Sequence, residues 1–171
     1  MAIRDIITIG HPTLTRIADP VAVVDDGIRA LAADMIDTMR SAPGIGLAAP
    51  QVDVSKRLIV IDPSAGENPD ETLVLVNPEI LEQEGQESGE EGCLSVPGVF
   101  EPVSRPTRAV VSYLDLEGVP RTVEGLNLKA RVLCHEIDHL NGKLFIERLS
   151  PLKRALIKKK LKKTRPQDEG R

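Results

Sequence analysis

Five short segments with the sequence pattern of strands follow one another along the middle of the chain, and their order constrains the fold more than any other feature. They are residues 57–62, 72–77, 79–84, 108–115 and 120–125, bounded by Pro, Gly, Asn and Asp clusters; the segments at 79–84 and 120–125 are mostly polar. Short runs between turn-forming clusters are typical of β-strands. Because the segments follow closely without intervening helices, we expect neighbouring strands to pair in an antiparallel manner.

Amphipathic segments lie on both sides of these strands. Residues 27–41 place apolar side chains at steps of three and four, which predicts a helix. Residues 126–141 predict a second helix that stops at Gly142, and residues 151–163 predict a third. We therefore expect an α+β fold in which antiparallel or mixed strands pack around the central helix 126–141, with a helix towards each end of the chain.

The length and composition suit one domain. The chain has 171 residues, of which 41% are hydrophobic, so we expect a single domain over 1–165 that includes the helix 151–163, with a frayed tail at 166–171. Aromatic residues make up 2% of the chain, which argues against stacking platforms for nucleic-acid bases, and we expect no DNA partner. The first residues lack the apolar run of a signal peptide, and no segment is long enough to cross a membrane, so we expect a cytoplasmic protein.

The charge is unevenly distributed. Residues 152–163 carry seven Lys or Arg and no acid, which leaves −11 on the rest of the chain, because the whole chain carries −4. A basic helix at the end of an acidic body suggests an anionic partner, although a solvated helix face gives the same pattern. The apolar residues Leu149, Leu152 and Leu156 are expected to pack on the body of the protein.

The sequence HEIDH at 135–139 is the first candidate for chemistry. At 3.6 residues per turn, His135 and His139 lie on one helical face, where both rings can reach one metal ion. Glu136 lies beside them and can reach a water molecule on that ion. A polar helix face with no metal is the alternative interpretation of these five residues.

A catalytic metal needs a third protein ligand and a position for water. Cys93 in EEGCLSVPG follows a glycine and can supply a thiolate, and a Cys, His, His set suits zinc or ferrous iron. Glu147 is a further candidate, only eight residues after His139. Cys134 lies about 100° around the helix from its neighbour His135, so we expect this second cysteine to be a packing residue.

The sequence GIGLAAPQ at 44–51 is the third candidate. It fits a glycine-rich dinucleotide pattern, but a helix precedes it where that pattern requires a strand, and Pro50 would fall in the first turns of the next helix. We interpret it as a glycine turn followed by an extended segment that can pair with a peptide, with the Gln51 amide available to an oxyanion. A plain turn before an edge strand is the alternative.

GIGLAAPQ, EGCLS and HEIDH, in that order, resemble the three signature motifs of the peptide deformylases, which remove the formyl group from the N-terminal methionine of new proteins. The resemblance extends over nearly the whole chain. It implies that Cys93, His135 and His139 are metal ligands, that Glu136 is the general acid and base, and that Gln51 and the Leu94 N–H stabilise the oxyanion. It further implies that Gly46 pairs with the substrate backbone and that Ile45, Leu128 and Val132 line the pocket for the methionine side chain.

The resemblance also implies a cofactor and partners. One divalent metal ion is expected, ferrous iron natively, with zinc, nickel or cobalt possible in purified protein. The expected substrates are N-formylmethionyl nascent peptides, and the basic helix 151–163 suggests docking on the ribosome. A basic residue that some members carry near the position of Phe100 is absent, so the resemblance leaves open how the peptide is held beyond its methionine.

Two other functions remain compatible with parts of the sequence. A zinc metallopeptidase built on HEIDH would cleave internal peptide bonds and would not depend on Cys93. A non-catalytic, metal-stabilised binding module associated with the ribosome would need a fourth protein ligand and would tolerate loss of Glu136. Neither alternative explains GIGLAAPQ.

Overall fold

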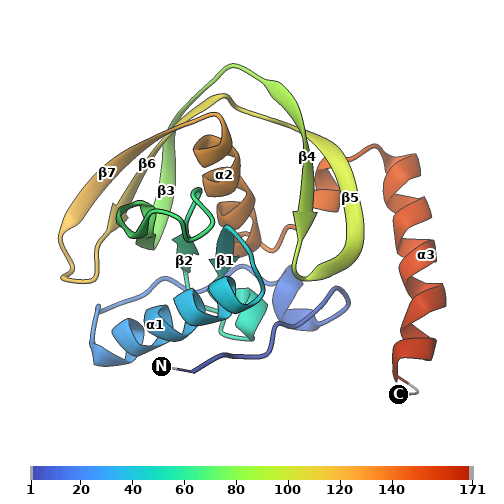
Figure 1. Cartoon of the computed structure of the whole chain (residues 1–171), viewed down its shortest axis with the longest axis horizontal. Helices are drawn as coiled ribbons and strands as arrows, with labels where there is room; N and C mark the ends of the chain where they lie inside the picture. Colours follow the sequence, from blue (N-terminus) through green and yellow to red (C-terminus); the bar gives the residue numbers. More distant parts are fainter. Residues whose placement is uncertain (1, 170–171) are drawn as a thin grey trace.

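The computed structural model describes the backbone of residues 2–169 and side chains as far as residue 163. Seven strands form two antiparallel sheets, a five-stranded sheet in the order β1-β2-β3-β6-β7 and a two-stranded sheet of β4 and β5 (Figure 1). The strands are β1 (Gly46–Ala48), β2 (Leu58–Ile61), β3 (Leu73–Glu84), β4 (Glu87–Cys93), β5 (Val96–Arg105), β6 (Arg108–Leu114) and β7 (Pro120–Leu126).

Three α-helices accompany the sheets, and the expected α+β fold with antiparallel pairing is confirmed. Helix α2 lies between the larger sheet and the β4–β5 pair, α1 lies across the larger sheet, and α3 stands at the edge beside β5 (Figure 1). The α-helices are α1 (Asp26–Ser41), α2 (Leu128–Leu140) and α3 (Pro151–Glu169), and the short 3₁₀ helices are η1 (Pro12–Thr15), η2 (Ala49–Val52), η3 (Pro69–Glu71) and η4 (Phe145–Arg148).

Strand β2 shows why the core has two sides. All four of its residues are buried, which explains the continuous apolar run LIVI. Leu58 and Val60 belong to the core cluster that contains α1, whereas Ile59 and Ile61 belong to the cluster that contains α2. Successive side chains of a strand point to opposite faces, so this strand is covered by a helix on each side.

Helix α2 starts after Asn127 and ends close to the predicted stop. Gly142 has a φ of 74°, and a Cβ atom there would lie 2.6 Å from the carbonyl oxygen of Thr15. A glycine is therefore required both for the left-handed conformation and for the close approach of the chain. Ten of the thirteen residues of α2 are buried, as expected for a helix enclosed by two sheets.

The prediction of two separate strands at 72–77 and 79–84 is wrong, because both belong to β3. The residues Asn77-Pro78 resemble a strand boundary in sequence, but they lie in a bulge where the register with β6 shifts. Asn77 has a φ of 50°, and its side-chain amide bonds the N–H and C=O of Val21. The missing N–H of Pro78 is tolerated at such an irregularity.

Strands β4 and β5 were not predicted. The segment ESGEEGC is rich in glycine and glutamate, and VPGVFEPVSR contains two prolines, so neither has the composition of a strand. Only two residues separate β3 from β4 and β5 from β6, so the two long antiparallel strands continue from one sheet into the other (Figure 1). The bend occurs at Gly85, which has a φ of 71° and leaves no room for a Cβ atom beside Thr107.

Helix α3 differs from prediction in its buried face and in its length. Leu152 and Leu156 are 71% and 59% exposed, whereas Ile157 is buried and packs with Phe145 in the cluster beside β5. Ile157 and Leu161 are four residues apart and therefore lie on the same face of α3, which faces the body of the protein. Leu149, which precedes the helix, packs in the same cluster.

Helix α3 also extends to Glu169, beyond the expected end at about residue 163. The helix includes the backbone of residues 166–169, and the frayed tail at 166–171 stays a prediction. Residues 170 and 171 lie outside the described part of the chain. Within residues 2–169, no helix combines the length and apolar character that crossing a bilayer requires.

Candidate active site

A cavity of about 410 Å³ opens between α2, β1 and the end of β4. Nine of the ten residues that the resemblance assigns to the site line it: Ile45, Gly46, Gln51, Cys93, Leu94, Leu128, Val132, His135 and Glu136. The tenth, His139, is buried at 1% exposure directly behind Cys93. Residues from all three motifs therefore meet at one place, although they are far apart in the sequence.

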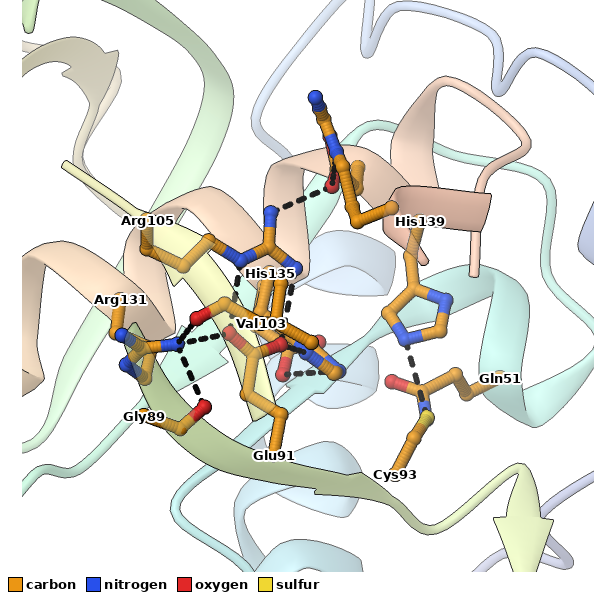
Figure 2. Close-up of polar contacts among 12 residues, drawn as sticks. Gln51, Gly89, Glu91, Cys93, Val103, Arg105, Arg131, His135 and His139 are labelled. Atoms are coloured by element: carbon orange, nitrogen blue, oxygen red, sulfur yellow. Dashed lines mark hydrogen bonds and ion pairs between the residues drawn. The ribbon is translucent and has the colours of Figure 1, made fainter. Parts of the chain in front are cut away.

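Cys93, His135 and His139 form a group that can hold a metal ion. Their ligand atoms all lie within 4.8 Å of one another, and Nε2 of His139 is 3.3 Å from Sγ of Cys93 (Figure 2). A thiolate with two imidazoles is a donor set that suits zinc or ferrous iron and leaves a position for water. Cys134 lies outside this group and packs against Ala109, Ala130 and Ile80, as predicted for a packing residue.

The hydrogen bonding of His135 prepares its ring for a metal. Nδ1 of His135 lies 2.9 Å from Oε1 of Glu91. Burial would raise the pKa of Glu91, but hydrogen bonds from His135 and Arg105 outweigh this effect and lower the pKa to about 2. The ionised Glu91 can only accept, so Nδ1 of His135 donates and Nε2 is directed towards Cys93 and the cavity.

The electrostatics at the two histidines suit a bound cation. Burial lowers the pKa of His135, but hydrogen bonds with Cys93 and Glu91 raise it to about 10. Burial lowers the pKa of His139 well below its usual range, and the charge of His135 lowers it further, so His139 has the neutral ring that binds metals. The site therefore attracts one positive charge, and a metal ion can replace the proton on His135.

Glu136 has the properties of a general base. Burial raises the pKa of its carboxyl group to about 7, close to the value at which a base works best at neutral pH. Among the described residues, its Oε1 atom has no hydrogen-bond partner although it is buried. Its Oε2 atom lies 4.0 Å from Nε2 of His135. A carboxylate with an unpaired oxygen beside the three ligand atoms is placed to bind a water molecule.

Gln51 is held in one orientation. Its Oε1 atom accepts a hydrogen bond from the Ala48 N–H at 3.0 Å, so its NH₂ group must point the other way. That group lies 3.1 Å from Oγ of Ser95 and 3.6 Å from Sγ of Cys93. The amide donor is thus fixed next to the metal-ligand group, and Leu94 follows Cys93 at the turn between β4 and β5.

Comparison with known proteins agrees with this geometry. The family model of polypeptide deformylase matches residues 3–155. The chain belongs to the polypeptide deformylase family. It is 53% identical to the peptide deformylase of Alkalilimnicola ehrlichii over 95% of this chain and 91% of that protein, and 52% identical to that of Nitrosococcus oceani over 95% and 96%.

Solved deformylase structures share the fold. The structure resembles a peptide deformylase from Legionella pneumophila with a TM-score of 0.91 and 46% identity, covering 99% of both chains. It also resembles the deformylase of Ehrlichia chaffeensis in complex with actinonin, with a TM-score of 0.88 and 39% identity over 96% of this chain and 98% of that one. Deformylases are metal-dependent, and the Cys93, His135 and His139 group can hold such an ion here.

Sequence reasoning missed the ionic network behind the deformylase site. Arg105 lies between Glu91 and Asp138, with its Nε 2.8 Å from Glu91 and its Nη1 2.7 Å from Asp138. Arg148 donates two further hydrogen bonds to Asp138. The spacing of two residues in the sequence could have indicated this network. Glu91 is two residues before Cys93 on a strand, and Asp138 is three residues after His135 on a helix. Each acid therefore shares a face with a metal-ligand candidate.

Gly46 allows Glu136 to approach β1. A Cβ atom at Gly46 would lie 2.6 Å from Oε2 of Glu136 and 3.0 Å from its Cδ. We expect Gly46→Ala to displace the carboxylate and to lower formate release from a formyl-methionyl peptide by about 100-fold, as a displacement of about 1 Å can. Gly27→Ala on α1 is the control and should leave the rate unchanged, since its Cβ would meet only Asp25 at 3.3 Å. A Gly46→Ala variant with the wild-type rate would contradict the assigned position of Glu136.

Proposed function

We propose that the protein is a peptide deformylase that removes the formyl group from the N-terminal formyl-methionine of newly synthesised proteins, through a catalytic domain formed by residues 1–165. The observation that supports this most is the meeting, in one cavity, of the Cys93, His135 and His139 group with Glu136 and the oriented amide of Gln51. Membership of the polypeptide deformylase family over residues 3–155 supports the same reaction.

In this proposal Cys93, His135 and His139 hold one divalent ion. When bound, such an ion acts as a Lewis acid and strongly lowers the pKa of a water molecule bound to it. Glu136 accepts the proton of the attacking water on its unpaired oxygen and then delivers it to the departing amine. Formate and a free methionine amine are the products.

Two groups of the chain are assigned to the developing oxyanion. The Gln51 amide and the Leu94 N–H donate hydrogen bonds to it, and loss of one donor of this kind typically costs about 100- to 1000-fold in rate. Gly46 is assigned to pair with the backbone of the peptide. Ile45, Leu128 and Val132, which line the same cavity, are assigned to the methionine side chain.

We assign ferrous iron as the native metal. The thiolate and imidazole donors suit both ferrous iron and zinc, and nickel or cobalt can occupy the same ligands in purified protein. A ferrous ion beside the Cys93 thiolate makes the enzyme sensitive to oxygen. Activity of iron-loaded protein is therefore expected to decay in air and to persist under anaerobic conditions. The activity of zinc-loaded protein should be the same in air and under anaerobic conditions.

Product analysis separates this function from the alternatives. Iron-loaded protein is incubated with formyl-Met-Ala-Ser and with acetyl-Met-Ala-Ser, and formate, acetate and peptide fragments are quantified. Formate from the first peptide, no acetate from the second and no internal cleavage are expected. Internal cleavage that survives Cys93→Ala would support a zinc metallopeptidase, and metal binding without any product would support a binding module.

Helix α3 is our candidate for a contact with the ribosome. It lies at the edge of the molecule (Figure 1), and its outer face carries exposed lysines, among them Lys159, Lys162 and Lys163. Leu152 and Leu156 are exposed on the same helix. A basic face of this kind suits the phosphate backbone of ribosomal RNA, with an attraction that weakens as salt increases.

The expected result is that replacing Lys159, Lys162 and Lys163 by Gln weakens co-sedimentation with ribosomes at low salt by about tenfold or more, since each contact to phosphate contributes a salt-dependent attraction. Substitution is preferable to deletion because Ile157 and Leu161 pack against the body. The control replaces three exposed cations elsewhere, Arg16, Lys56 and Lys143, by Gln. Equal binding by both triple variants would show that α3 has no special role.

A further inference from the structure

Arg131 connects helix α2 to both strands of the smaller sheet. Its Nη1 atom is 2.6 Å from Oε2 of Glu91, 2.8 Å from the carbonyl oxygen of Val103 and 3.3 Å from that of Gly89. Its Nη2 atom is 2.8 Å from the carbonyl oxygen of Glu87. Figure 2 shows the guanidinium group between the two strands, beside the carboxylate that bonds His135. The side chain is 13% exposed and lines the edge of the catalytic cavity.

These contacts join the two parts of the molecule that supply the metal-ligand candidates. Cys93 ends β4, whereas His135 and His139 lie on α2. The β4–β5 sheet shares no strand pairing with the five-stranded sheet among the described residues and is joined to it through the short links to β3 and β6, so side-chain contacts help to hold it against α2. Arg131 is one helical turn before His135, and Glu91 is two residues before Cys93, so the bonds of Arg131 act next to both ligands.

Gly89 is the strand position that admits this arginine. A Cβ atom at Gly89 would lie 3.0 Å from Nη2 and 3.1 Å from Cζ of Arg131. Gly89 lies within β4, opposite Val103, and its backbone is outside the left-handed region that favours glycine. The conformation of the strand does not require a glycine here. A Cβ atom at this position would force the guanidinium group to move by a few tenths of an ångström.

We propose that Arg131 is a positioning residue that fixes Cys93 relative to His135 and His139, and that Gly89 provides the space for it. The inference rests on the metal site of the proposed function. A guanidinium group offers five donors in a rigid fork, which four acceptors on two strands can use together, and a lysine cannot replace it. Outer partners of metal ligands typically affect metal affinity by about 10- to 100-fold.

Cobalt(II) is a suitable probe because its absorption reports the thiolate bond of Cys93 directly. The full-length protein is loaded with cobalt, its thiolate-to-cobalt band is recorded, and the rate of cobalt loss to a chelator is measured. Arg131→Lys and Gly89→Ala are each expected to shift the band and to accelerate cobalt loss by about 10- to 100-fold. Arg121→Met is the control, because Arg121 pairs with Asp115 on the distant β6–β7 hairpin.

A double-mutant comparison tests whether Gly89 acts through Arg131. In the Arg131→Met background, Gly89→Ala should cause no further acceleration, because the group that it displaces is gone. A purely structural role would lower the melting temperature of the variants and leave the cobalt band and its release rate unchanged, which would overturn the inference. If Arg131→Met fails to fold, the cobalt band and the release rate of Arg131→Lys and Gly89→Ala are compared with those of the wild-type protein instead.

The outcome for the wild-type protein keeps the two proposals distinguishable. Wild-type protein that binds no cobalt would contradict the metal site of the proposed function itself. Wild-type protein that binds cobalt, together with an Arg131→Lys variant that releases it at the same rate, would contradict only the positioning role of Arg131. Gly89→Ala with an unaltered band and release rate would contradict the role of Gly89 in the same way.

Discussion

Glu136→Gln is expected to keep its metal ion and to lose about 100- to 10,000-fold in formate release, the range typical of a lost general acid and base. Glutamine has the shape of glutamate but cannot accept the proton of the attacking water. The three ligand candidates, Cys93, His135 and His139, are untouched by the change. Metal content per chain and the steady-state rate with formyl-Met-Ala-Ser are the two quantities to measure.

Glu117→Gln is a matched control for this variant. Glu117 is exposed on the hairpin between β6 and β7, outside the residues that line the cavity. The Glu117→Gln protein should have the wild-type rate. A Glu136→Gln protein that retains more than about a tenth of the wild-type rate would contradict the assigned role, because a missing base normally costs at least about 100-fold.

Cys93→Ala is expected to abolish both metal binding and turnover. The thiolate is one of three ligand atoms within 4.8 Å of one another, and two imidazoles alone hold a divalent ion much more weakly. We expect less than about a tenth of an equivalent of metal per chain after dialysis, since an open site needs three protein ligands, and no measurable formate release. Metal content is measured by elemental analysis of the same samples that are assayed.

The second cysteine provides the control. Cys134→Ala removes a buried thiol that packs against Ala109 and Ala130, and burial raises the pKa of that thiol. Its loss should lower the stability of the fold by about 1 kcal/mol, as is common for small truncations in a core, with metal content and rate preserved. Metal retained by the Cys93→Ala protein and lost by the Cys134→Ala protein would reverse the assignment of the two cysteines.

The helices and the site motifs could be predicted from sequence because they depend on short-range patterns. His135 and His139 share a helical face by their spacing alone, and Gly142 marks the end of that helix through its left-handed conformation. The residues alone offered both Cys93 and Glu147 as a third ligand beside the two histidines, and the assignment of Cys93 relied on the resemblance to a family. No local pattern shows that a strand 42 residues away lies against α2.

What could not be predicted depends on contacts between distant segments. Strands β4 and β5 form through pairing with each other, although Gly89, Gly92 and two prolines weaken their intrinsic tendency to be extended. The buried face of α3 is selected by the cluster around Phe145, which accepts Ile157 in place of Leu152. The contacts of Arg131 are made mostly to backbone carbonyls. Because every residue has a backbone carbonyl, the residue types of the strands do not indicate these contacts.

The most direct test of the proposed function is a titration of metal-free protein with ferrous iron under anaerobic conditions, with formate release from formyl-Met-Ala-Ser measured at each addition. A single site of Cys93, His135 and His139 predicts that the rate rises in proportion to added iron and becomes constant at about one equivalent per chain. Acetyl-Met-Ala-Ser should release nothing throughout. Absence of formate at every iron concentration, or a rate that does not depend on iron, would contradict the assignment of this chain as a metal-dependent deformylase.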